Sequence, residues 1–194
     1  MSVKPNYLVE IVIRALVSLM CCIVIGYIFY QSQIFNRHTG TFSIPVYGLI
    51  GSIFFYSMRV NIKNAFAALL VLFVMDSALV THATRLPYLV RDLLCIGALS
   101  AAVYIFYKYF YNKNQKERWL EPLILSALAA AFILAATLLL TIINKTLSVV
   151  SLQWIYYIAK LYFLIGLGIG IGIILTEEPY LDKIRMYFRN FFKN

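Results

Sequence analysis

The chain has 194 residues, of which 62% are hydrophobic and 13% are charged, and its mean hydropathy is +0.82. A soluble domain typically has about 45–50% apolar and about 25% charged residues, so a water-soluble globule of this composition could not cover its surface with polar groups. The net charge of +9 does not indicate nucleic-acid binding, because the basic residues stand mostly at the ends of apolar runs. We therefore predict an integral membrane protein that meets the lipid bilayer and no nucleic acid.

Six apolar runs follow one another along the chain. The first begins near Tyr7 and is longer than the roughly 7–15-residue core of a signal peptide, and no A-x-A cleavage pattern follows it, so we expect a retained helix. Pro45, Pro87 and Pro122 stand at the start of the second, fourth and fifth runs, where a missing N–H costs little. The runs predict an all-α polytopic bundle of six transmembrane helices, at about residues 7–30, 42–58, 64–81, 87–110, 121–143 and 148–176.

The basic residues predict the orientation of this bundle. With the N-terminus in the cytoplasm, eleven basic residues lie outside the helices on the cytoplasmic side, against about four on the outer side. An even number of helices then places the C-terminus inside as well. We expect one transmembrane domain over residues 1–176 and a basic, amphipathic cytoplasmic tail over 177–194, which either lies on the inner leaflet or is an ordinary positive flank of the last helix.

Few polar residues occur at membrane depth, and these are the candidates for a functional site. Lys160 stands near the middle of the sixth run, so we expect it to face the bundle interior and to need an acidic or carbonyl partner. Asp76 and Asp92 flank the third-to-fourth hairpin, with Arg91 beside them. These four side chains predict either an outward-facing pocket for a small amphoteric ligand or a charge network that only holds helices together.

Small residues mark where helices approach one another closely. We expect the fifth and sixth helices to pack through two sets of small residues, and one glycine face of the sixth helix to be open for a partner subunit. The sets are Ala127, Ala131 and Ala135 on the fifth helix and Gly166, Gly168, Gly170 and Gly172 on the sixth.

No cofactor or metal is expected. Cys21, Cys22 and Cys95 lie within apolar runs, and their spacing matches neither a zinc site nor a disulfide framework. A catalytic constellation is also absent from the sequence pattern, so an enzyme is the least favoured class.

In size and topology the chain resembles the substrate-binding subunits of energy-coupling-factor vitamin transporters. Those subunits dock a partner through an AxxxA-type stripe on the first helix, whereas here Leu19 stands where the second small residue after Ala15 would be. The resemblance implies a ligand pocket on the outer face. We therefore expect a small-molecule-binding or transport subunit in the cytoplasmic membrane of a prokaryote, with a non-catalytic scaffold or assembly subunit as the alternative.

Overall fold

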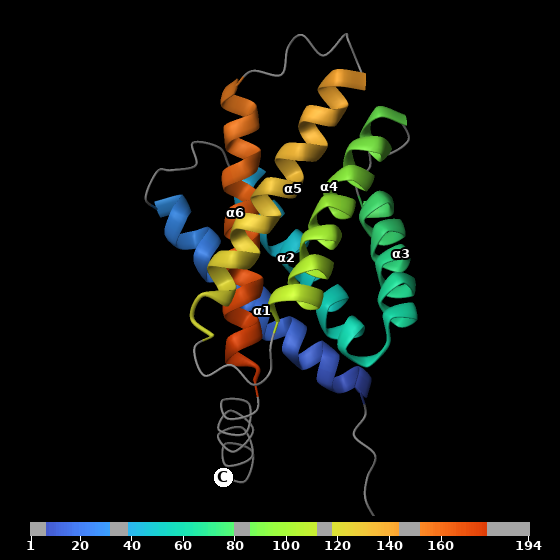
Figure 1. Cartoon of the computed structure of the whole chain (residues 1–194), viewed down its shortest axis with the longest axis vertical. Coiled ribbons are helices and arrows are strands. Elements are labelled where there is room, and N and C mark those ends of the chain that lie inside the picture. The colour runs from blue at the N-terminus through green and yellow to red at the C-terminus, as the bar shows by residue number, and fades with distance from the viewer. Residues whose placement is uncertain (1–6, 32–38, 80–85, 112–117, 144–151, 178–194) are drawn as a thin grey trace, which may run out of the picture.

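The computed structural model describes residues 7–31, 39–79, 86–111, 118–143 and 152–177. These residues form six α-helices and one π-helix and contain no strand (Figure 1). The helices are α1 (Tyr7–Gln31), α2 (Thr39–Val60), α3 (Ile62–Leu79), α4 (Leu86–Ile105), α5 (Glu121–Ile143) and α6 (Leu152–Leu175), and the π-helix η1 (Phe106–Phe110) continues α4. The prediction of an all-α protein is confirmed.

Four helices are long and apolar enough to cross a membrane. The segments are Val9–Phe29 in α1, Leu93–Phe110 in α4 and η1, Glu121–Leu139 in α5 and Ile155–Leu175 in α6. Among the described residues, α2 and α3 contribute the shorter apolar segments Ile44–Val60 and Ile62–Val71. Continuous apolar surface of this length is suited to lipid rather than water, which is the physical basis for an integral membrane protein.

The bundle is organised around α6. This helix packs on α5, α1 and α2, while α4 packs on α5 and α2, and α3 lies at the edge against α2 with few contacts to α4 (Figure 1). The fully buried side chains include Tyr162, Ile165 and Ile169 of α6, together with Phe55 of α2 and Phe106 of η1. The start of α1 and the end of α6 lie at the same end of the bundle, the lower end in Figure 1.

The glycines of α6 meet two different helices. A methyl group on Gly166 would lie 2.7 Å from the Cα atom of Ser126 in α5. One on Gly172 would lie 2.5 Å from the Cα atom of Ser18 in α1. Gly170 likewise faces Pro122 of α5, and Gly168 faces Cys22 of α1. Both glycine faces are therefore filled from within this chain, which corrects the expectation that one was open for a partner.

The alanine stripe of α5 does not form the contact expected of it. Ala127, Ala131 and Ala135 are all exposed. The residues of α5 that meet the glycines of α6 are instead Pro122, Leu125 and Ser126. The stripe lies on the other side of α5 because the positions that approach α6 are displaced around the helix from 127, 131 and 135, at 100° per residue.

Candidate functional site

Three of the four polar residues expected to form a pocket have side chains outside the described part of the structure. Asp76 lies on α3, and Arg91 and Asp92 lie in the second turn of α4. Their positions on these helices are described, but their side-chain contacts are not. The amphoteric pocket therefore stays a prediction, as does the amphipathic tail, which beyond Glu177 also lies outside the described residues.

Lys160 is the one of the four whose side chain the structure describes. It is half-buried, and its Nζ atom lies 4.2 Å from the ring centroid of Tyr156, a residue that is 62% exposed. Tyr156 is one turn nearer the start of α6, so the ammonium group extends toward residue 155, where the apolar segment begins. This is a cation–π contact, and the expected acidic or carbonyl partner stays a prediction.

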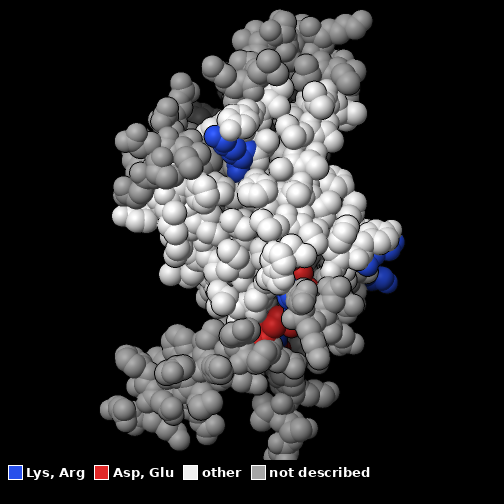
Figure 2. All heavy atoms as spheres, turned by 60° about the vertical axis from the view of Figure 1, so that its left-hand side comes forward, with Lys and Arg blue, Asp and Glu red and all other residues white. Residues whose placement is uncertain are grey.

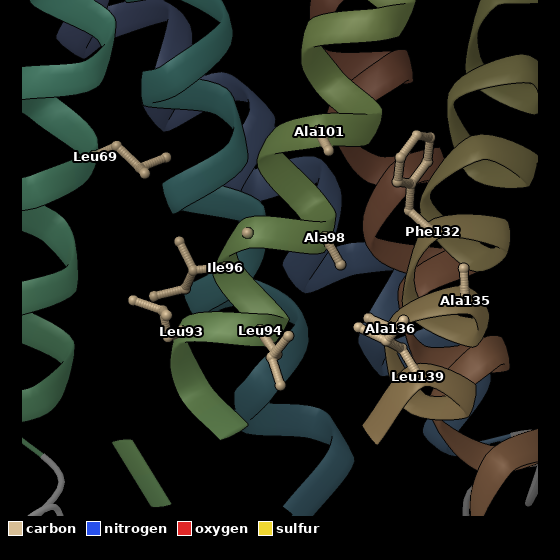
Figure 3. Close-up of a pocket in the computed structure, with 11 residues that line it drawn as sticks. Leu69, Leu93, Leu94, Ile96, Ala98, Ala101, Phe132, Ala135, Ala136 and Leu139 are labelled. Atoms are coloured by element: carbon tan, nitrogen blue, oxygen red, sulfur yellow. The ribbon is translucent and has the colours of Figure 1, made fainter. Parts of the chain in front are cut away.

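An apolar groove of about 550 Å³ runs along α4 between α3 and α5 (Figure 3). Leu94 and Ala98 of α4 point toward α5, whose Phe132 and Leu139 close that side. On the other side, Leu69 of α3 projects toward α4. The lining consists of Leu69, Leu93, Leu94, Ile96, Gly97, Ala98, Ala101, Phe132, Ala135, Ala136 and Leu139. All of these side chains are apolar, and those of α4 and α5 lie within the candidate membrane segments.

Gly97 leaves unfilled space in this groove. A methyl group added to it would have no other atom within 4 Å, whereas the glycines of α6 have backbone or side-chain atoms well inside that distance. A glycine inside a helix costs about 0.5–1 kcal/mol relative to alanine. Close helix packing therefore does not explain Gly97. The missing side chain instead leaves open space on the α4 side of the groove.

Charged side chains and a tyrosine hydroxyl, from four parts of the chain, meet at the lower end of the bundle. Figure 2 shows acidic and basic atoms together there. The Nη1 atom of Arg59 lies 3.2 Å from Oε1 of Glu177, and the Tyr111 hydroxyl donates to the same oxygen at 2.6 Å. Arg118 lies 3.3 Å from Oε2 of Glu177 through Nη1, and 2.9 Å from Oε1 of Glu121 through Nε. We call these five residues the Glu177 clasp.

Tyr111 is the aromatic centre of the clasp. Its backbone N–H donates to the Phe106 carbonyl at 2.9 Å, and its own backbone is extended, which ends η1. The guanidinium carbons of Arg59 and Arg118 lie 5.5 and 5.0 Å from the ring centroid. Phe55 meets the ring edge-on at 5.2 Å. Cation–π and aromatic contacts thus hold the ring that carries the donating hydroxyl.

The clasp changes the acidity of its members. Burial raises the pKa of the Tyr111 phenol, and the hydrogen bond to Glu177 raises it further, so the phenol remains a donor. Burial alone would raise the pKa of Glu177, but the hydrogen bond from Tyr111 and the charges of Arg59 and Arg118 outweigh burial and hold that pKa below its ordinary value. Glu177 is therefore an anion in the folded protein near neutral pH.

A second polar group adjoins the clasp between α1, α2 and α6. The Tyr56 hydroxyl lies 2.7 Å from Oγ1 of Thr176 and 3.4 Å from Oγ of Ser18. Arg14 places its guanidinium 6.0 Å from the Tyr56 ring centroid and pairs with Glu10 one turn earlier. Among the described residues, Nε of the buried Arg14 has no hydrogen-bond partner. Polar layers inside a lipid-facing bundle fix helix rotation, because any other rotation leaves these groups unpaired.

Sequence reasoning missed the clasp. Glu177 falls at the start of the predicted tail over 177–194, and Arg59 and Arg118 are two of the eleven basic residues that predict the orientation. The spacing Arg118-x-x-Glu121 at a helix start and the tyrosines that end α4 were the available signals. Neither signal identifies Glu177 as the shared partner. Among the described residues, no three His, Cys, Asp or Glu side chains lie close enough together to hold a metal ion.

The lowered pKa of Glu177 predicts acid sensitivity. A group whose pKa is lower in the folded than in the unfolded state stabilises the fold above its unfolded pKa of about 4.3, and this contribution is lost as pH falls through the folded pKa. We expect the melting temperature of the wild type in detergent to exceed that of Glu177→Gln at neutral pH and the two to converge in acid. Thermal unfolding of both proteins, followed by circular dichroism from neutral to acid pH, tests this prediction. A difference in melting temperature that does not change with pH would contradict it.

We compared the chain with known proteins by sequence and by structure. No protein-family model, curated protein or solved structure matches it.

Proposed function

We propose that this protein is a six-span membrane subunit, with both termini in the cytoplasm of a prokaryote, that binds a lipid-soluble small molecule in the α3–α4–α5 groove. The common position of the start of α1 and the end of α6 supports the topology (Figure 1). The excess of basic residues in the loops at that end supports its cytoplasmic orientation. In this proposal the clasp lies on the cytoplasmic side and the groove within the membrane.

The groove carries the binding proposal. Its volume of about 550 Å³ falls within the roughly 300–1,000 Å³ of small-molecule sites. Its lining is apolar, so the part of a ligand held there is a hydrocarbon chain or ring that enters from the bilayer. Arg91 and Asp92 directly precede Leu93 of the lining, and we propose them, with Asp76, for the polar part of an amphipathic ligand. Lys160 does not line the groove.

Gly97→Leu tests the groove directly. The probe is a long-chain fatty acid with a photoreactive diazirine, cross-linked to the protein in liposomes and mapped by peptide mass spectrometry. We expect labelling of α4 and α5 in the wild type and a loss of about tenfold in Gly97→Leu, corresponding to about 1.4 kcal/mol of binding. The leucine has room because nothing lies within 4 Å of its Cβ position, so the fold should be kept.

Ala131→Leu is the matched control for that experiment. Ala131 is exposed on α5 and does not line the groove, so the same added side chain should leave labelling unchanged. Equal labelling in the wild type and in Gly97→Leu would contradict the binding proposal.

A scaffold or assembly role is the second candidate, and the alanine stripe favours it. Ala127, Ala131 and Ala135 recur every four residues, are exposed, and leave a smooth surface on which another membrane helix could pack. In that role Ala131→Leu would release the partner subunit and Gly97→Leu would not. The same two variants therefore separate the two candidates, with native mass spectrometry of the purified assembly as the measurement.

A further inference from the structure

The helices α4 and α5, which form the floor and one side of the groove, both contact a single carboxylate at their lower ends. Tyr111 follows η1 at the end of the helix that forms the floor, and Arg118 stands three residues before α5, which forms one side. The Tyr111 hydroxyl contacts Oε1 of Glu177, and Arg118 contacts Oε2 of the same residue. Glu177 lies at the end of α6, and Arg59 at the end of α2 also binds it. Glu177 therefore links the lower ends of α4 and α5 to each other and to the ends of α2 and α6.

A π-helix separates the clasp from the groove. The groove-lining part of α4 ends at Ala101, and η1 spans Phe106–Phe110. A π-helical turn departs from the regular i to i−4 hydrogen bonding of an α-helix, and such turns are recognised places where helices bend. In the part of the chain that the structure describes, α4 also has few contacts with α3 to hold it on that side. The chain thus has a bending point between a fastened end and the groove.

We infer that the Glu177 clasp sets the spacing of α4 and α5 and thereby the width of the groove; its functional meaning rests on the proposed function. With Glu177 bound by Arg59, Tyr111 and Arg118, the groove has the width seen here. When that carboxylate is lost, α4 turns at η1 and the groove changes most at the end far from the clasp. Within the described residues, the groups that face Glu177 from the surrounding elements are these three, with Glu121 as the second carboxylate on Arg118.

Spin labels at Leu93 and Leu139 measure this spacing. These residues lie on α4 and α5 at the groove and are 57% and 55% exposed, so labels should be tolerated (Figure 3). The full-length protein, with its native cysteines replaced by alanine, is reconstituted for electron-electron double resonance. We expect Glu177→Gln to shift or broaden the distance by about 2 Å or more. Tyr111→Phe, which removes only a hydroxyl, should shift it less and in the same direction.

Two controls make the result specific. A label pair at Leu138 and Tyr156 reports α5 against α6, which the glycine contacts hold together, and should not move. Lys63→Gln removes an exposed charge near the same end and should leave both distances unchanged. Movement of both label pairs would show general loosening and would overturn the inference.

The remaining outcomes also decide the matter. An unchanged distance between residues 93 and 139 in both clasp variants overturns the inference, and if Glu177→Gln does not fold, Tyr111→Phe decides alone. Fatty-acid labelling is read separately from the distance. If the distance changes but the wild type is not labelled, only the proposed function is contradicted. If labelling is intact but the distance does not change, only the inference about the clasp is contradicted.

Discussion

Replacing Gly166 by alanine is expected to destabilise the protein by about 3 kcal/mol, the upper part of the usual range for an overpacked core. The new methyl group would lie 2.7 Å from Cα of Ser126, 2.8 Å from the carbonyl oxygen of Leu125 and 2.9 Å from the backbone nitrogen of Ser126. These are backbone atoms, so α5 and α6 would have to separate. Thermal unfolding in detergent, followed by circular dichroism, should show a melting temperature lower by roughly 6–12 °C.

Gly97→Ala is the matched control for Gly166→Ala. It makes the same chemical change within another apolar helix, but the new methyl group meets no atom within 4 Å. We expect the melting temperature to stay the same or to rise slightly, because alanine favours the helix by about 0.5–1 kcal/mol. A similar loss of stability in both variants would show that the close approach of α5 and α6 is not the cause.

Glu177→Ala is expected to cost about 3 kcal/mol, because it leaves two largely buried guanidinium groups and the half-buried Tyr111 hydroxyl without their shared acceptor. The side chains of Arg59 and Arg118 are only 16% and 15% exposed, so water compensates little for the lost carboxylate. The same melting experiment at neutral pH measures the effect.

The control for Glu177→Ala is Lys63→Ala. Lys63 is exposed at the start of α3, so its removal should change stability by less than about 0.5 kcal/mol. If Glu177→Ala were as stable as Lys63→Ala, the clasp would contribute nothing measurable to the free energy of unfolding.

The two parts of the candidate site differ in how far the sequence could reveal them. The groove depends on Gly97 and Ala101 facing outward along α4 while α3 and α5 stand on either side, which is a matter of helix rotation and tilt. The clasp joins Arg59 to Glu177, which are 118 positions apart in the chain. The pattern within any one helix contains no information on such a pairing, and the polar residue that stands out within an apolar run, Lys160, belongs to neither part of the site.

The sequence by itself determined that the protein is helical and apolar enough for a membrane, because long uninterrupted apolar runs are a local property of the chain. Only the tertiary structure decided which side of each helix faces inward. In a soluble helix the apolar stripe marks that side, but in a lipid-facing helix every side is apolar and the stripe is lost. Close backbone contacts, as at Gly166, and polar pairs, as at Glu177, then fix the rotation, and both depend on residues from distant parts of the chain.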